Sequence, residues 1–174
     1  MHPPSPLISL FQYKAWANQE LLHALRSLDP LQQHDELHAA LRILNHIYVV
    51  DRIFAAHLQG EAHPYQATNT PQTPSLEALH QAVTTSDHWY LAYVAELSED
   101  QRTERLSFQF VDGDAGCMSR EEILLHLITH GSYHRGAVGR IMAQLSLAPP
   151  RDIYSRFVHQ AEPQRRQPLT TSST

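Results

Sequence analysis

The stretch EILLHLITHGSYHRG, residues 122–136, carries three histidines at steps of four: His126, His130 and His134. Apolar residues recur around them with the 3.6-residue period of an α-helix, and acidic residues follow Ser119 as they do at helix N-termini. We therefore predict a long helix from Ser119 to about Leu147, where the sequence APP ends it. The apolar stripe of this helix has to pack against other helices, and that requirement decides the fold.

The rest of the chain predicts three further long helices, again from apolar residues at helical spacing. They run from about Pro6 to Ser27, from about Asp35 to Gln59, and from Thr73, as N-cap, to about Leu97. Residues 105–119, RLSFQFVDGDAGCMS, predict a small β-hairpin before the last helix, or an irregular loop in its place. Four amphipathic helices with a long crossover between helices 2 and 3 make an all-α four-helix bundle.

Length and composition favour one globular domain. The chain has 174 residues, enough to bury a core without disulfides, and a single cysteine, Cys117. The net charge is −5 and there is no basic block, so we expect no nucleic-acid partner. No window has the ~20 apolar residues of a membrane span and the start resembles no signal peptide, so we expect no membrane partner and a cytoplasmic location. We place the domain at residues 1–158 and a flexible tail at residues 159–174.

Two of the three histidines lie within the apolar stripe of the last helix. At about 100° per residue, His134 lies about 40° from His130, and apolar residues flank both. His126 lies at the edge of the stripe, about 12 Å along the axis from His134, so the three cannot share one ion. Residues at i and i+4 are neighbours on one face, and His130 and His134 are therefore the pair best placed to bind a metal ion.

The second helix offers a third ligand. His46 lies among the apolar residues of that helix, so its imidazole is expected to face the bundle interior. Together, His46, His130 and His134 would form a three-nitrogen site with at least one coordination position open to water or substrate. His57 is the rival donor on the same face, about 16 Å from His46 along the axis. The alternative is that these are core histidines with hydrogen-bond partners, because an unpartnered buried imidazole is costly.

The residues between the paired histidines restrict the chemistry. They are Gly131, Ser132 and Tyr133, without the glutamate of an H-E-x-x-H metalloprotease, so peptide hydrolysis of that kind is not expected. A three-histidine divalent centre can lower the pKa of a bound water to about 7 or hold a thiol as thiolate. Either species is a nucleophile at neutral pH, and Tyr133 would flank the pocket that holds it.

Other polar residues are interpreted as structural. Asp51 and Arg135 each point about 140° away from the histidine of their helix, so we expect Asp51 to be a structural partner. We expect Arg135 to form an ion pair on the bundle surface, with an anion anchor as the alternative.

Gly131 and Gly136 each lower the stability of the helix by about 1 kcal/mol relative to Ala, which indicates close packing or room for a ligand at these positions. Cys117, without a nearby histidine in sequence, is expected to be inert.

Three stretches of the sequence carry a resemblance to a known family. They are YKAWANQELL (13–22), LNHIYVVDRIF (44–54) and HLITHGSYHRGAV (126–138), and their order and spacing extend over about residues 6–158. In these motifs the chain resembles the DinB family, and RDIYSRF (151–157) is similar to the closing segment of that family. The resemblance implies a four-helix bundle, usually a homodimer, with a divalent metal held by His46, His130 and His134. Characterised relatives include transferases and isomerases that use a low-molecular-weight thiol.

Two functions from different classes remain open. The first is a divalent-metal-dependent enzyme, a thiol-dependent transferase or a hydrolase, that acts on a small-molecule substrate. The second is a non-catalytic, metal-binding helical bundle with a stress-related binding or interaction role. We expect Zn or Ni as the metal, and Fe also suits three imidazoles. A pocket that reaches the metal from solvent would favour the enzyme, whereas a fourth protein ligand would favour a structural metal.

The second helix also motivates a homodimer. Opposite His46 it carries a second apolar side, formed by Leu37, Leu41, Leu44, Tyr48 and Ala55. A helix that is apolar on both sides is usually buried on both, either against a neighbouring helix or against a second copy of the chain. Both alternatives fit the sequence, and the family resemblance favours the dimer.

Overall fold

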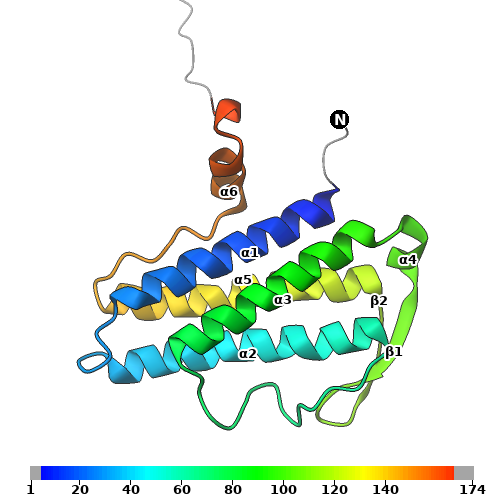
Figure 1. The fold of residues 1–174 in the computed structure, drawn as a ribbon, viewed down its shortest axis with the longest axis horizontal. Helices are drawn as coiled ribbons and strands as arrows, with labels where there is room; N and C mark the ends of the chain where they lie inside the picture. Colours follow the sequence, from blue (N-terminus) through cyan, green and yellow to red (C-terminus); the bar gives the residue numbers. More distant parts are fainter. Residues whose placement is uncertain (1–4, 167–174) are drawn as a thin grey trace, which may run out of the picture.

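The computed structural model describes residues 5–166, which form six α-helices and one two-stranded sheet. The four long helices are α1 (Pro6–Ala24), α2 (His34–Gln59), α3 (Leu76–Glu96) and α5 (Arg120–Gln144). Figure 1 shows them side by side, with α1 packed mainly on α3 and α2 mainly on α5. The predicted four-helix bundle is therefore confirmed. No helix in the described range is long and apolar enough to cross a membrane.

The crossover over residues 60–75 sets the direction of α3. α2 ends at Gly60, whose φ of 70° is the left-handed conformation that glycine adopts without strain. The chain then returns along the outside of α2, so that α2 and α3 run in the same direction (Figure 1). Several side-chain hydrogen bonds fix this segment to α2; among them, Asn45 donates to the Thr70 hydroxyl at 2.6 Å, and Asn69 donates to the Arg42 carbonyl at 2.9 Å.

Three helix ends differ from those expected. α1 ends at Ala24 rather than near Ser27, and the chain continues as a 3-10 turn, η1 (Leu25–Ser27). The N-cap of α3 is Ser75, whose hydroxyl accepts a hydrogen bond from the Ala78 backbone N–H at 3.2 Å. The hydroxyl of Thr73, the predicted N-cap, lies instead 2.9 Å from His38 Nε2, a contact that holds the crossover on α2. α5 ends at Gln144 rather than near Leu147, because Ser146 has a φ of 59°, which is outside the helical range.

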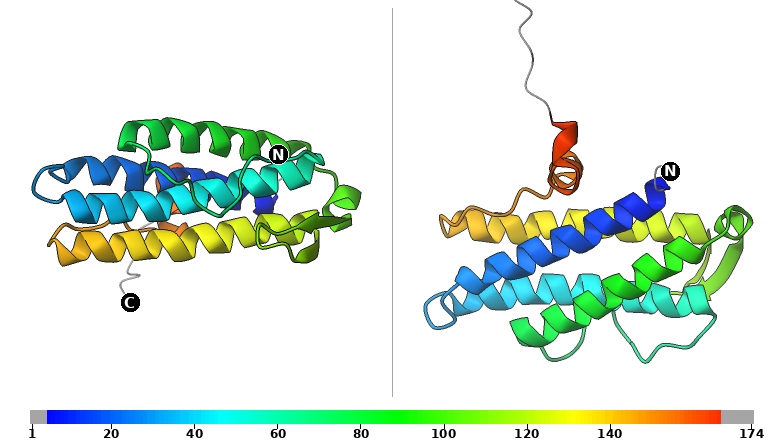
Figure 2. Two further views of the ribbon diagram at one scale, coloured as in Figure 1. Left: turned by 90° about the horizontal axis from the view of Figure 1, so that it is seen from below. Right: turned by 45° about the horizontal axis from the view of Figure 1, so that its top comes forward.

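A β-hairpin closes one end of the bundle, as Figure 2 shows. The short helix α4 (Glu99–Thr103) leads into β1 (Arg105–Gln109), which pairs antiparallel with β2 (Ala115–Ser119). Phe108 of β1 packs against the core and lies opposite Gly116, where a Cβ would come within 2.6 Å of the Phe108 ring. The predicted hairpin is confirmed, and Gly116 leaves the space that the Phe108 ring requires.

The core consists of two apolar clusters with a polar layer between them. The layer is made of buried polar side chains from all four long helices: Lys14, Asn18, Asp51, Asp87 and Arg135. Along α1, α3 and α5 these residues lie between positions that belong to the cluster near the hairpin and positions that belong to the other cluster, and on α2 Asp51 directly follows Val50, the first position of the cluster near the hairpin. The bundle therefore places charged groups at mid-height, close to the level of the histidines of α2 and α5.

The segment after α5 crosses α1 and ends in α6 (Tyr154–Ala161) and a short 3-10 turn, η2 (Pro163–Arg165). Figures 1 and 2 show α6 projecting from the side of the bundle. Its residues Tyr154 and Phe157 pack on α1, with ring centroids 5.6 Å from Tyr13 and 5.8 Å from Trp16, respectively. The boundary placed at residue 158 falls inside this helix. The flexibility of the tail stays a prediction, and residues 167–174 lie outside the described range.

The second apolar side of α2 packs within the bundle. Leu41, Leu44 and Ala55 are buried, while Leu37 and Tyr48 are partly buried against the same core. The observation that motivated a homodimer is therefore explained within a single chain. The homodimer itself stays a prediction.

Candidate metal centre

The packing of α2 on α5 brings His46, His130 and His134 together. One ring nitrogen from each lies within 4.8 Å of the others, and His46 Nε2 is 3.0 Å from His130 Nε2. Nitrogens bound to one tetrahedral zinc ion lie about 3.3 Å apart, given Zn–N distances of about 2.0–2.1 Å. The three imidazoles therefore fit a single divalent ion with small side-chain adjustments.

The orientation of His46 is set by the crossover. Its Nδ1 lies 2.8 Å from the backbone carbonyl oxygen of Thr68, which can only accept, so Nδ1 carries the proton. The nitrogen left to bind a metal ion is then Nε2, which faces His130. A second ring nitrogen held by a carbonyl is the usual outer contact of a metal-binding histidine. No side-chain pattern in the sequence indicates this contact, because Thr68 makes it through its backbone.

Burial favours the neutral form of His130 and His134. Burial, followed by the neighbouring His134 and His46, lowers the pKa of His130 to about 3, and burial followed by His46 lowers the pKa of His134. Among the described residues, buried His130 Nδ1 has no hydrogen-bond partner. Neutral imidazole is the form that binds a metal ion, so the lowered pKa values of His130 and His134 favour metal binding at neutral pH.

The site is open on one side. Within residues 5–166, no fourth His, Cys, Asp or Glu joins the three histidines. A cavity of about 210 Å³, called the inner cavity below, reaches His46 and His130. The rest of its lining is mainly apolar and comprises Val50, Ile53, Phe54, His57, Thr68, Phe110, Val111 and His126. Three protein ligands and access to a cavity are features of catalytic metal sites, whereas structural sites are closed by a fourth ligand.

The two other histidines considered from the sequence line the cavity and do not join the group. The His126 ring stacks on His130 at a centroid distance of 5.3 Å, and burial lowers the pKa of His126. The His57 ring stacks on Phe108 at 4.8 Å, and burial followed by the neighbouring His63 lowers the pKa of His57. His57, the rival donor, therefore belongs to the wall of the inner cavity.

Tyr133 and Cys117 lie at the surface. Tyr133 is 78% exposed, with its ring centroid 5.1 Å from that of His134, so it lies beside the histidines but, contrary to expectation, does not line the inner cavity. Cys117 is an exposed free cysteine on β2 and does not line the inner cavity.

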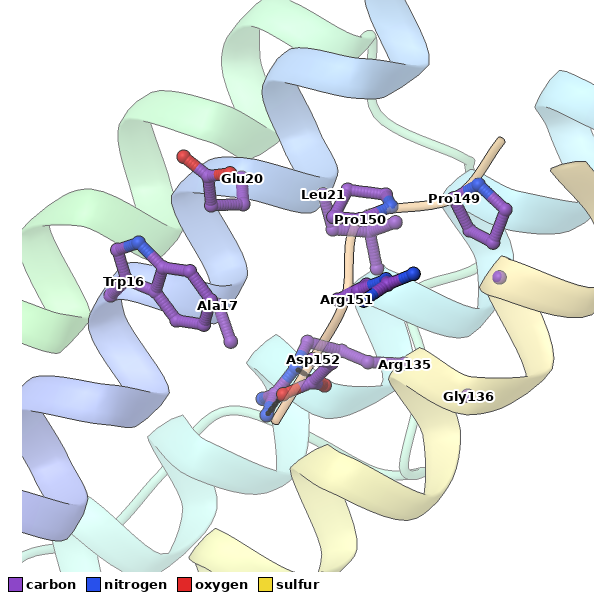
Figure 3. Close-up of a pocket in the computed structure, with 11 residues that line it drawn as sticks. Trp16, Ala17, Glu20, Leu21, Arg135, Gly136, Pro149, Pro150, Arg151 and Asp152 are labelled. Atoms are coloured by element: carbon purple, nitrogen blue, oxygen red, sulfur yellow. Dashed lines mark hydrogen bonds and ion pairs between the residues drawn. The ribbon is translucent and has the colours of Figure 1, made fainter. Parts of the chain in front are cut away.

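Arg135 is buried, and the expectation that it lies on the surface is wrong. The residue is 2% exposed, its Nε donates to Asp152 Oδ2 at 2.8 Å, and its Nη1 donates to Asn18 Oδ1 at 3.2 Å. The helical period placed Arg135 away from the histidines but could not show that α1 and the segment after α5 cover this face. Figure 3 shows the Arg135–Asp152 pair beside a separate cavity of about 200 Å³, lined also by Trp16 and Pro150.

Lys14 is the buried charge that the sequence analysis missed. Its Nζ donates to Asp51 Oδ2 at 2.6 Å and to Asp87 Oδ1 at 3.1 Å, in the polar layer of the core. Asp51 is thus the structural partner that its position predicted. A lysine within the apolar stripe of the first helix was the available signal, but its two partners come from helices far away in the sequence.

Comparison with known proteins agrees with this architecture. The model of the DinB family matches residues 4–167. The chain is 22% identical over 159 residues to Protein DinB of Bacillus subtilis (strain 168), and the match covers 86% of this chain and 91% of that protein. No solved structure gives a significant match. Because the family match extends over all four long helices and the segment after them, the chain belongs to the DinB family.

Proposed function

We propose that this protein is a divalent-metal-dependent enzyme that acts on a small molecule, as a thiol-dependent transferase or as a hydrolase. The supporting observation is that three imidazoles converge at the edge of an apolar cavity. A structural metal would call for a fourth protein ligand, and the described residues supply none at this place.

Each part of the site has a role in this proposal. His46, His130 and His134 would hold the ion, with the Thr68 carbonyl fixing the ring of His46. When bound, a divalent ion would make a neighbouring water or thiol more acidic and so supply a nucleophile at neutral pH. The inner cavity would bind the substrate and keep bulk water away from it. The donor set suits Zn or Ni first, and also Fe.

Metal analysis of the untagged protein tests the site. Replacement of His46, His130 or His134 by Ala should lower the metal content to below about a tenth, because two imidazoles hold an ion far more weakly than three. His126→Ala is the matched control and should keep its metal, since His126 lies outside the group. Full metal occupancy in the His46→Ala protein would contradict the assignment.

Activity screens then separate the two classes of function. The metal-loaded protein should catalyse thiol transfer to small electrophiles or hydrolysis of small esters or amides, and the metal-free protein should not. The thiol-dependent alternative, with a low-molecular-weight thiol as partner, is supported by the family resemblance. A protein that binds metal stoichiometrically and is inactive in both screens would instead be a non-catalytic metal-binding bundle.

A further inference from the structure

The inner cavity adjoins a second cavity that opens to solvent. This outer cavity, of about 520 Å³, lies between the start of the crossover and the hairpin. His57, Phe110 and Val111 line both cavities, so the two meet at these three side chains. For a molecule that reaches His46 and His130 through the inner cavity, these three side chains are the boundary to the outer one.

The inner cavity offers a molecule almost only apolar surface. Its aliphatic and aromatic walls come from α2 and from the hairpin turn, and they include Val50, Ile53, Phe54 and Phe110. Phe54 is fixed between two rings, at centroid distances of 5.3 Å from His126 and 5.5 Å from Phe108. An apolar cavity of about 150 Å³ is known to hold benzene, so about 210 Å³ is room for one ring-sized apolar group.

The outer cavity is different in character. Its lining includes the exposed polar side chains of Glu61, Gln66 and Gln109. His63 also lines it, and among the described residues His63 Nδ1 lacks a hydrogen-bond partner. Polar groups of a bound molecule can be hydrogen-bonded here, whereas in the inner cavity they would lose their water without replacement.

We propose that the substrate of the metal site has two parts. An apolar group of about the size of a benzene ring occupies the inner cavity beside His46 and His130, and a polar part extends past Val111 into the outer cavity. This inference rests on the proposed function, because the reacting group has to lie at the three histidines. It narrows the substrate class, since a small molecule without an apolar group would leave the inner cavity unfilled.

Thiols bound to the cobalt(II)-loaded protein test the inner cavity. Benzyl mercaptan and 2-mercaptoethanol present the same donor atom to the ion, but only the first carries a ring. Thiolate binding changes the absorption spectrum of cobalt(II), which gives the dissociation constant without an activity assay. We expect benzyl mercaptan to bind at least tenfold more tightly, because burial of its ring removes apolar surface from water. Equal affinities would overturn the inference and leave the proposed function standing.

A para-hydroxymethyl derivative of benzyl mercaptan tests the connection between the cavities. Its polar group should reach the outer cavity, so its dissociation constant should stay within about threefold of that of benzyl mercaptan. Loss of binding would show that the inner cavity is closed at His57, Phe110 and Val111, and would overturn the two-part substrate.

The variant Val111→Trp tests whether the ring of benzyl mercaptan binds in the inner cavity. Val111 belongs to the hairpin turn and not to the core, and it lines the inner cavity, so the larger ring should take up space in this cavity without unfolding the bundle. We expect the preference for benzyl mercaptan to fall at least fivefold, while cobalt content and 2-mercaptoethanol binding stay unchanged. Leu125→Trp, at an exposed position of α5 outside both cavities, should keep the preference. An unchanged preference in Val111→Trp would contradict the assigned cavity.

Ligand binding to the metal-free protein distinguishes failure of the proposed function from failure of the two-part substrate. If no metal binds, the proposed function fails, and binding of fluorobenzene, followed by ¹⁹F NMR, still tests the inner cavity. Binding that Val111→Trp abolishes and Leu125→Trp preserves would support an apolar ligand group at this place. Absence of binding to the wild-type protein would overturn it.

Discussion

At the scale of single residues, Lys14 is a buried cation that holds two carboxylates in the core. It is fully buried and shared between Asp51 and Asp87 at 2.6 and 3.1 Å. Lys14→Met keeps most of the side-chain volume but leaves two buried carboxylates without their cation, a loss that costs about 3–5 kcal/mol. Urea denaturation should show a decrease of that size in the free energy of unfolding. Arg26→Met, which removes the exposed ion pair with Glu77, is the control and should cost less than about 1 kcal/mol. A similar small loss in both variants would contradict the role of Lys14.

Asp51 should give the stability a distinctive pH dependence. Burial raises the pKa of Asp51 from 3.8 to about 6, because the loss of hydration outweighs the opposing effect of Lys14 and the neighbouring Asp87 adds to the shift. Between these pH values the folded chain binds this proton more readily than the unfolded chain, so the contribution of Asp51 to stability rises as the pH falls. Asp51→Asn cannot titrate. The difference in unfolding free energy, wild type minus Asp51→Asn, should therefore increase when urea denaturation is repeated from pH 7 down to pH 4.5. A difference independent of pH would show that the Asp51 pKa is not raised.

At the scale of secondary-structure elements, two glycines of α5 should respond to alanine in opposite ways. A Cβ at Gly131 would lie 3.0 Å from Arg135 Nη1 and 3.8 Å from Lys14 Cε, whereas a Cβ at Gly136 would meet nothing within 4 Å. The Arg135 guanidinium is held by Asp152 and Asn18 and cannot easily move away. We expect Gly131→Ala to destabilise the protein by about 1–2 kcal/mol and Gly136→Ala to stabilise it by about 0.5–1 kcal/mol. Thermal denaturation of the two variants provides the comparison, and shifts of the same sign would contradict it.

The extent of the elements could be read from the sequence where local patterns decide it. The apolar periodicity and Gly60 define α2 to within one residue, and Ser119 opens α5 as expected. The start of α3 was misplaced because Thr73 and Ser75 are both good N-caps, and only the contact of Thr73 with His38 decides between them. α6 was missed because its eight residues are held by the rings of α1, a contact that local sequence does not encode.

In the candidate site, too, some residues can be identified from the sequence and others only from the fold. His46, His130 and His134 could be selected from the sequence because each interrupts an apolar stripe, and the structure brings them together. The Thr68 carbonyl and the walls from the hairpin turn come from segments without a periodic pattern, so their approach to the histidines is visible only in the fold.

At the scale of the whole molecule, the homodimer has to be tested directly. The apolar side of α2 that motivated it is covered within one chain, so a dimer would use another surface. We still expect a dimer from the family resemblance. Sedimentation at micromolar concentration should give about twice the chain mass of 19.8 kDa, and a strictly monomeric mass would reject the dimer. The arrangement of the three histidines within one chain would be unaffected by that result.

Metal binding should stabilise the entire bundle, because the three histidines join α2 to α5 through one ion. A ligand that binds only the folded chain, present at a hundred times its dissociation constant, adds about 2.7 kcal/mol to the free energy of unfolding. For a chain of this size that corresponds to an increase of about 5–10 °C in Tm, which calorimetry measures and a chelator should reverse. His126→Ala should keep the increase, since it leaves all three nitrogens in place, whereas His46→Ala should lose it. An equal increase in His46→Ala would mean that the stabilising ion binds elsewhere, and the junction between α2 and α5 would then not be the metal site.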